Sequence, residues 1–106
     1  MKKDCIFCQI TNNKTETDFL YEDEEVVAFN DINPQAEIHV LVVPKKHIPT
    51  IKDLQEEDRG LVSKMIWAAK KIAADKELDG YRLQINVGRS GGQEIDHIHL
   101  HLLANK

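Results

Sequence analysis

The sequence of 106 residues lacks several features that would assign it to a specialised class of protein. No apolar run approaches the roughly 20 residues of a membrane-spanning helix, so we expect no membrane partner. Basic residues do not predominate, because 14 lysines and arginines stand against 18 acidic residues and the net charge is −4. We therefore expect no general binding of nucleic acid. Repeats, low-complexity tracts and linkers are also missing, and the length fits one domain, 1–106, with a modest core.

Cysteine is scarce, and both cysteines lie near the N-terminus in the spacing Cys5-x-x-Cys8. No apolar segment follows the first lysines, as it would in a secretory leader, so we expect a cytoplasmic protein with reduced thiols. The spacing is typical of a metal or a redox site. A redox pair would normally follow a strand of a βαβ unit, which this sequence does not show. Zinc would need two further ligands, for which His47 and His97 are candidates, and two unrelated buried thiols are the alternative.

Three of the five histidines lie in one short stretch, 97–102, where His97, His99 and His101 alternate with aliphatic residues. In a strand, successive side chains point to opposite faces, so the three imidazoles would share one face and the aliphatic residues the other. Aligned imidazoles could carry out nucleophilic or acid–base chemistry, or they could bind a metal. A histidine-lined strand without a function is the third possibility.

A glycine-rich segment, Gly88 to Gln93, leads into this histidine strand and holds three of the five glycines. Glycine allows successive backbone N–H groups to turn inward around an anion. A plain flexible loop is the alternative. The position of the segment directly before three aligned histidines favours a phosphate next to a nucleophile.

The apolar pattern predicts an α+β domain in which an antiparallel sheet carries one long helix. We expect a short helical turn over residues 5–10 and a helix from about 55 to 77, started by a capping box of Asp53 and Glu56. The expected strands are 19–21, 26–29, 38–43, 81–87 and 97–103. The strand 38–43 is continuously β-branched or aliphatic and should be buried on both faces. The apolar stripe of the long helix is wider than one sheet face needs, so the helix is either deeply buried or meets a second copy of the chain.

These motifs together resemble the histidine triad (HIT) nucleotide-binding family, and within it the Hint branch. The resemblance extends from Cys5 to Leu103, nearly the whole chain. The matching segments are Cys5-Ile-Phe-Cys8, Asp31-Ile-Asn-Pro-Gln-Ala36, His39-Val-Leu-Val-Val-Pro-Lys-Lys-His47-Ile48, Asn86-x-Gly88, Gly91-Gly-Gln93 and His97-Ile-His99-Leu-His101-Leu-Leu103.

The resemblance implies a HIT-like α+β fold with a five-stranded antiparallel sheet, one long helix and a short N-terminal helix. It also implies a homodimer in which the two sheets become continuous. Members of the family hydrolyse purine nucleoside phosphoramidates, such as adenosine 5′-monophosphoramidate, or transfer the nucleotide. We therefore expect a hydrolase that binds AMP- or GMP-type nucleotides and passes through a covalent nucleotidyl-histidine.

The resemblance also assigns roles to individual residues. His99 would attack the α-phosphorus, His101 would contact the phosphate and the leaving group, and His39 would be a further active-site histidine. Asp31 would accept the ribose hydroxyls. The expected phosphate contacts are Asn86, Gly92, Gln93 and the backbone of Glu94, and the expected slot for the base is Ile6, Phe7, Ile10, Phe29 and Ile32.

In zinc-bearing members of the family, the metal is held by residues that match Cys5, Cys8, His47 and His97. This implies one structural zinc ion per chain, with no metal needed for catalysis. In members without zinc, the first triad histidine belongs instead to the network of the active site.

Two residues depart from the family pattern. Animal members have serine at the position of Glu94, whose carboxylate would repel a phosphate, so we expect only its backbone N–H to take part. Asp96 stands where the family usually has a bulkier residue. Two other functions stay open from the sequence: a nucleotide-binding interaction protein with little turnover, and a hydrolase of dinucleoside polyphosphates.

Overall fold

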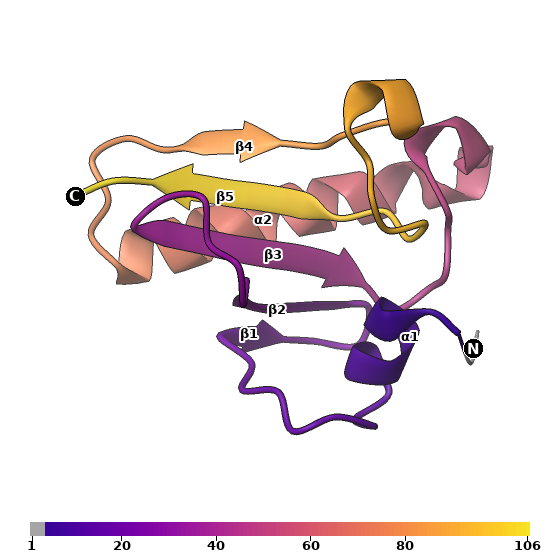
Figure 1. Cartoon of the computed structure of the whole chain (residues 1–106), viewed down its shortest axis with the longest axis horizontal. Helices are drawn as coiled ribbons and strands as arrows, with labels where there is room; N and C mark the ends of the chain where they lie inside the picture. The colour runs from indigo at the N-terminus through magenta and orange to yellow at the C-terminus, as the bar shows by residue number, and fades with distance from the viewer. Residues whose placement is uncertain (1–3) are drawn as a thin grey trace.

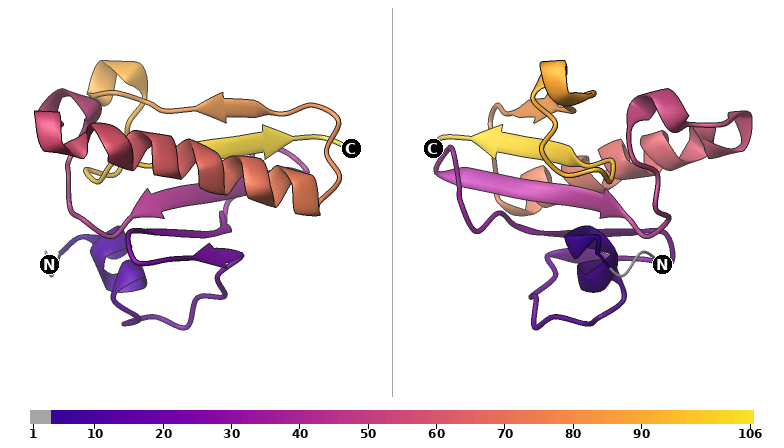
Figure 2. Two further views of the ribbon diagram at one scale, coloured as in Figure 1. Left: turned by 180° about the vertical axis from the view of Figure 1, so that it is seen from behind. Right: turned by 45° about the vertical axis from the view of Figure 1, so that its right-hand side comes forward.

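The computed structural model describes residues 4–106 and contains one antiparallel sheet of five strands, in the order β1-β2-β3-β5-β4 (Figure 1). The strands are β1 Tyr21–Glu22, β2 Val26–Asn30, β3 Ile38–Pro44, β4 Arg82–Gln84 and β5 Leu100–Ala104. The α-helices are α1 Ile6–Thr11 and α2 Arg59–Asp75. The long helix α2 crosses one face of the sheet, and the short helix α1 lies near the end of β3 (Figure 2). The predicted α+β architecture is confirmed.

The central strand β3 separates two apolar clusters, because alternate side chains point to opposite faces. Val40 and Val42 pack with the buried side of α2. Leu41 and Val43 pack on the other face, together with the apolar residues of α1. All four side chains are at most 6% exposed, which confirms the prediction of a strand buried on both faces.

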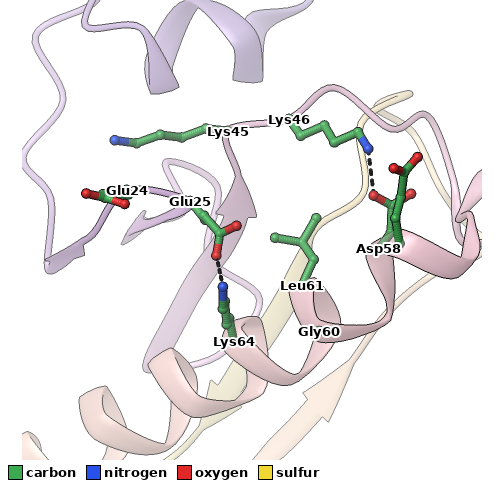
Figure 3. A pocket seen from close by; sticks show the side chains of 9 residues that line it. Glu24, Glu25, Lys45, Lys46, Asp58, Gly60, Leu61 and Lys64 are labelled. Carbon is green, nitrogen blue, oxygen red and sulfur yellow. Dashed lines mark hydrogen bonds and ion pairs between the residues drawn. The ribbon is translucent and has the colours of Figure 1, made fainter.

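The long helix begins later than the sequence suggested, and the predicted capping box of Asp53 and Glu56 is wrong. Two 3₁₀ turns, Ile51–Asp53 and Glu56–Asp58, precede α2. The backbone N–H of Gln55 donates to Asp58 Oδ2 at 2.9 Å, and Lys46 Nζ donates to Asp58 Oδ1 at 2.6 Å. Figure 3 shows this ion pair, which connects the loop after β3 to the start of α2. Both residues line a surface pocket, in which Lys64 of α2 also pairs with Glu25.

The last strand also begins later than predicted, because its ladder starts at Leu100 and not at His97. The segment before it is tied elsewhere: the N–H of Ile98 donates to the carbonyl of Ile48 at 2.7 Å. The alternation of side chains nevertheless continues, since Ile98 and Leu100 both pack in the α2 cluster. The strand predicted over 81–87 forms only as β4, Arg82–Gln84. The strand predicted over 19–21 is shifted, because β1 covers Tyr21–Glu22 and shares only Tyr21 with the prediction.

Helix α2 is buried along one side only. Met65, Ala68, Ala69, Ile72 and Ala73 are at most 3% exposed, whereas the neighbouring Ile66 and Trp67 are 45% and 54% exposed. Among residues 4–106, no helix combines the length and the apolar character needed to cross a membrane.

Candidate active site and metal centre

The middle histidine of the triad, His99, is held in one orientation by the backbone. Its Nδ1 lies 2.8 Å from the carbonyl oxygen of His97, and the ring is in edge contact with Phe7 of α1 at 5.0 Å between centroids. Because a carbonyl can only accept, Nδ1 carries the proton of the neutral ring and Nε2 carries the lone pair. Burial lowers the pKa of His99, although its hydrogen bond to the His97 carbonyl acts in the opposite direction. The side chain is therefore a neutral nucleophile at neutral pH.

His101 and His39 form a second hydrogen-bonded pair whose tautomers follow from one backbone contact. The N–H of Gln35 donates to His39 Nδ1 at 3.1 Å, so neutral His39 carries its proton on Nε2. His39 Nε2 lies 2.8 Å from His101 Nδ1 and donates to it. His101 must then carry its own proton on Nε2, and this atom is free to act as a donor. Burial lowers the pKa of His101 to about 4, so the ring stays neutral at pH 7.

Asp31 joins this pair from the turn after β2. Its Oδ1 accepts the N–H of Asn33 at 2.9 Å, and its Oδ2 lies 3.4 Å from His39 Nε2. The carboxylate is half-buried, at 19% exposure of the side chain. It is thus oriented by the turn and placed beside the imidazoles, where it can accept hydrogen bonds from a ligand.

A pocket of about 360 Å³ opens in front of His99, between α1, the end of β2 and the glycine-rich loop. The sequence-predicted residues that line it are His99, Asp31, Gly92, Glu94, Ile6, Phe7, Ile10, Phe29 and Ile32. Ile32 lies at the rim with 92% of its surface exposed. The sequence analysis missed the lining residues Thr17, Asn30, Asn33, Gln35, Leu41 and Ile95. Leu41 could have been found, because it alternates with residues that face α2.

Four of the residues predicted to be catalytic or to bind the substrate lie outside the lining of this pocket: His39, His101, Asn86 and Gln93. Gln93 is 3% exposed, and its amide is fully engaged. Its Oε1 accepts the N–H of Gly88 at 2.9 Å, and its Nε2 donates to the carbonyls of Pro49 and Ile95. Its backbone N–H donates to the Gly88 carbonyl. The side chain expected to contact phosphate therefore holds the glycine-rich loop closed.

Asn86 acts on the same loop, because its Nδ2 donates to the carbonyl of Gly91 at 2.8 Å. Gly92 has a φ of +89°, in the left-handed region, and a Cβ there would lie 3.2 Å from Asn86 Nδ2. The backbone N–H of Glu94, two residues after Gly92, makes no hydrogen bond within residues 4–106. Gly92 and Glu94 both line the pocket with His99, so the loop can present an unpaired donor to an anion there.

The four residues predicted as metal ligands, Cys5, Cys8, His47 and His97, come together in one cluster. Their ligand atoms all lie within 4.8 Å of one another. His97 Nδ1 lies 3.3 Å from Cys5 Sγ, 3.6 Å from Cys8 Sγ and 3.2 Å from His47 Nδ1. Bonds of about 2.0–2.3 Å to a tetrahedral zinc ion would separate such ligand atoms by roughly 3.3–3.8 Å. The cluster therefore has the dimensions of a structural Cys2His2 metal site.

The protonation of the cluster also suits a metal. His97 Nε2 lies 2.8 Å from the Pro44 carbonyl and donates to it, so the Nδ1 lone pair faces the other ligands. Burial lowers the pKa of His97 to about 4, which keeps the ring in the neutral form that binds metals. Asp31, His39 and His101 form a second group of potential metal ligands. In this group the proton on His39 Nε2 already lies between the ligand atoms and is donated to His101 Nδ1, so no cation is required.

Comparison with known proteins gives a consistent picture. Residues 4–106 match the family described as "Scavenger mRNA decapping enzyme C-term binding". The purine nucleoside phosphoramidase of Escherichia coli (strain K12) is 43% identical over 108 residues, which cover 100% of this chain and 91% of that protein. A histidine triad protein from Clostridium difficile is 44% identical and superposes with a TM-score of 0.95, covering 100% of this chain and 94% of its own. A Zn-bound histidine triad family protein from Mycobacterium smegmatis is 33% identical, with a TM-score of 0.86 and coverage of 97% and 76%.

The conformation of the glycine-rich loop can be tested with two neighbouring alanine variants. Gly92→Ala should destabilise the fold by about 1–2 kcal/mol and weaken AMP binding, because the added Cβ is strained at positive φ and crowds Asn86. Gly91→Ala is the matched control, since nothing lies within 4 Å of its Cβ. Thermal unfolding and AMP titration measure both effects. Equal behaviour of the two variants would contradict this description of the loop.

Proposed function

The chain belongs to the histidine triad family, and from that premise we propose that it is a hydrolase of purine nucleoside phosphoramidates. The similarity to the purine nucleoside phosphoramidase of E. coli supports this substrate class. The observation that carries the proposal is the orientation of His99, which lines the pocket and whose Nδ1–H is held by the His97 carbonyl, so that Nε2 carries the lone pair. We propose that this Nε2 is the nucleophile.

The proposed reaction proceeds in two steps. In the first, the lone pair of His99 Nε2 forms a bond to the α-phosphorus, and the phosphorus–nitrogen bond of the substrate breaks. The amine leaves with that electron pair and takes up a proton from water near His101, which is half-buried. In the second, water forms a bond to phosphorus, the bond to His99 breaks, and one proton is released to solvent. The products are a nucleoside monophosphate and the amine.

Groups around His99 are placed to stabilise the charge that develops. Attack makes the His99 ring cationic, and its Nδ1–H then donates more strongly to the His97 carbonyl. His101 Nε2–H and the unpaired N–H of Glu94 are donors for the phosphoryl oxygens. Gly92 allows close approach of the backbone, while Asn86 and Gln93 contribute by holding the loop.

The rest of the substrate fits the apolar half of the pocket. We propose that Asp31 accepts the ribose hydroxyls. The base would lie among Ile6, Phe7, Ile10, Phe29 and Ile32, where aliphatic and aromatic surface predominates. Such a slot recognises a purine by its flat shape, so adenine and guanine nucleotides should both bind.

The nucleophile is tested by replacing it. His99→Ala should lower kcat for adenosine 5′-monophosphoramidate by about a thousandfold or more, because no other group can form the covalent intermediate. AMP affinity should change only about threefold, since the slot for the base is intact. The reaction of the wild-type protein is quenched rapidly and the protein is digested at neutral pH or above, because the adduct is sensitive to acid. Mass spectrometry should then find the nucleotidyl group on His99.

His101→Ala is the control, because it retains the nucleophile and should still form the adduct, more slowly. Turnover by His99→Ala at the wild-type rate, or an adduct on another residue, would disprove the assignment. AMP binding with no adduct and no turnover would indicate a nucleotide-binding interaction protein. Faster turnover of diadenosine polyphosphates than of phosphoramidates would indicate a dinucleoside-polyphosphate hydrolase.

We further propose that Cys5, Cys8, His47 and His97 hold one structural zinc ion per chain and that catalysis needs no metal. The distances and the tautomer of His97 support this, as does the Zn-bound relative from M. smegmatis. A bound cation would favour the thiolate forms, whereas burial alone raises the pKa of Cys5. Two reduced cysteines that bind a metal are also consistent with our expectation of a cytoplasmic protein.

Metal analysis tests this assignment. The purified protein should contain about one zinc ion per chain, and the double variant Cys5→Ser/Cys8→Ser should lose the metal and unfold at a lower temperature. The control Asp31→Asn, which alters the other cluster of potential ligands, should retain its zinc. A wild-type protein purified without chelators that holds no zinc, and whose stability does not respond to added zinc, would refute the proposal.

We propose that two copies associate through β4 and the exposed side of α2. Leu83 pairs with Leu102, which packs against α2, so Leu83 lies on the α2 face of the sheet at its edge strand. Leu83 is 40% exposed and Trp67 on α2 is 54% exposed, and β4 offers an unpaired edge to a second strand.

Sedimentation of the purified chain should therefore show a dimer. Trp67→Glu should shift the equilibrium toward the monomer, because a carboxylate would be buried in the interface. The control is Leu20→Glu, which alters another exposed apolar residue, directly before β1 at the sheet edge opposite to β4. A wild-type monomer at micromolar concentration would overturn the dimer proposal.

A further inference from the structure

Arg89 lies close to the site but has no role in the reaction proposed above. It lies in the 3₁₀ turn Arg89–Gly91 of the glycine-rich loop and does not line the pocket. One arm of its guanidinium, Nη1, donates to the backbone carbonyl of Gln93. The other arm, Nη2, pairs with Asp96 Oδ2 at 3.0 Å. An arginine that spans a carbonyl and a carboxylate in this way fixes both partners, because its donors have a rigid planar geometry.

The Gln93 carbonyl belongs to the same peptide group as the N–H of Glu94. Residues 4–106 contain no cis peptide bond, so this carbonyl and this N–H point in opposite directions. Arg89 holds the carbonyl on the solvent side, where its own side chain is 64% exposed. The N–H of the same peptide group therefore points away from the guanidinium, and Glu94 is one of the residues that line the pocket with His99.

The neighbouring peptide group is fixed independently, because the N–H of Gln93 donates to the Gly88 carbonyl at 3.0 Å. The Gln93 side chain is fixed by three further hydrogen bonds. The Gln93–Glu94 peptide group is held through its carbonyl, and among residues 4–106 Arg89 is the side chain that donates to this carbonyl.

We propose that Arg89, itself held by Asp96, is a positioning residue that orients the Glu94 N–H for the transition state of phosphoryl transfer. The proposal rests on the proposed function of the site. It also accounts for Asp96, a residue that departs from the pattern of the family and whose carboxylate here has a defined partner. A donor already aligned before the reaction stabilises the developing charge without any reorganisation.

Kinetics of point variants test the proposal. Arg89→Ala should lower kcat for adenosine 5′-monophosphoramidate about tenfold, with KM changed less than about threefold, because the donor acts mainly in the transition state. Asp96→Ala should lower kcat about threefold, and Asp96→Asn, whose oxygen still accepts from Arg89, should stay close to the wild type. Arg89→Lys should recover only part of the loss, since one ammonium group cannot hold both partners. Arg59→Ala, which changes an exposed arginine of α2, is the control and should have no effect.

A double variant separates positioning from simple loss of charge. Arg89→Ala/Asp96→Ala should be no slower than Arg89→Ala, because Asp96 acts only through the guanidinium. Additive losses, or a kcat for Arg89→Ala within twofold of the wild type, would overturn the proposal. The thermal midpoint should stay within about 2 °C in all variants, because the ion pair is exposed and contributes little to stability.

NMR distinguishes failure of this proposal from failure of the proposed function. On titration with AMP, the Glu94 amide proton of the wild-type protein should move downfield as it donates to the phosphate, and in Arg89→Ala this shift should be at most half as large. If the wild-type protein does not turn over phosphoramidates, the proposed function falls, and this titration still decides the role of Arg89. An undiminished shift in Arg89→Ala would refute the positioning role whatever the activity.

Discussion

The structure depends most on the fixed position of His97. Three of its polar groups point in three directions: Nε2 to the Pro44 carbonyl, Nδ1 to the Cys/His cluster, and the backbone carbonyl to His99 Nδ1. The ring is completely buried and packs against the edge of Phe7. Displacing His97 would therefore disturb the cluster and also remove the acceptor that sets the tautomer of His99. The proposed metal site and the proposed nucleophile are therefore connected through His97.

Helix α1 adds a second connection between these two centres. Cys5 accepts the N–H of Cys8 at the start of the helix, and both thiols point into the cluster. Phe7, between them in sequence, faces the pocket and contacts the rings of His97 and His99. The helix of six residues and its N-cap Cys5 thus form a wall of the pocket and provide two of the four proposed metal ligands. These two roles explain why apolar residues and cysteines are interleaved in the segment from Cys5 to Cys8.

Local patterns in the sequence predicted what depends on local geometry. The alternation of residues 97–102 predicted that the three imidazoles share a face. The spacing of the two cysteines indicated a metal or redox site, for which His47 and His97 were candidate further ligands. The pairing of His39 with His101 depends on the register between β3 and β5, which no short pattern contains. The start of α2 was mispredicted because two segments, from Asp53 and from Gln55, both resemble a capping box, and the distant Lys46 favours the second. Gln93 was expected to contact phosphate, but a buried amide must satisfy its hydrogen bonds, and here the surrounding loop does so.

The contact between Cys5 and His97 has a consequence for how the protein is made, because 92 positions of the chain separate the two residues. Closing so long a loop is slow compared with forming α2 or the hairpin of β1 and β2. During synthesis, residue 97 must therefore leave the ribosome before Cys5 can meet this partner. The proposed metal site and the orientation of His99 can thus form only after the first helix has waited for most of residues 5–97 to be made.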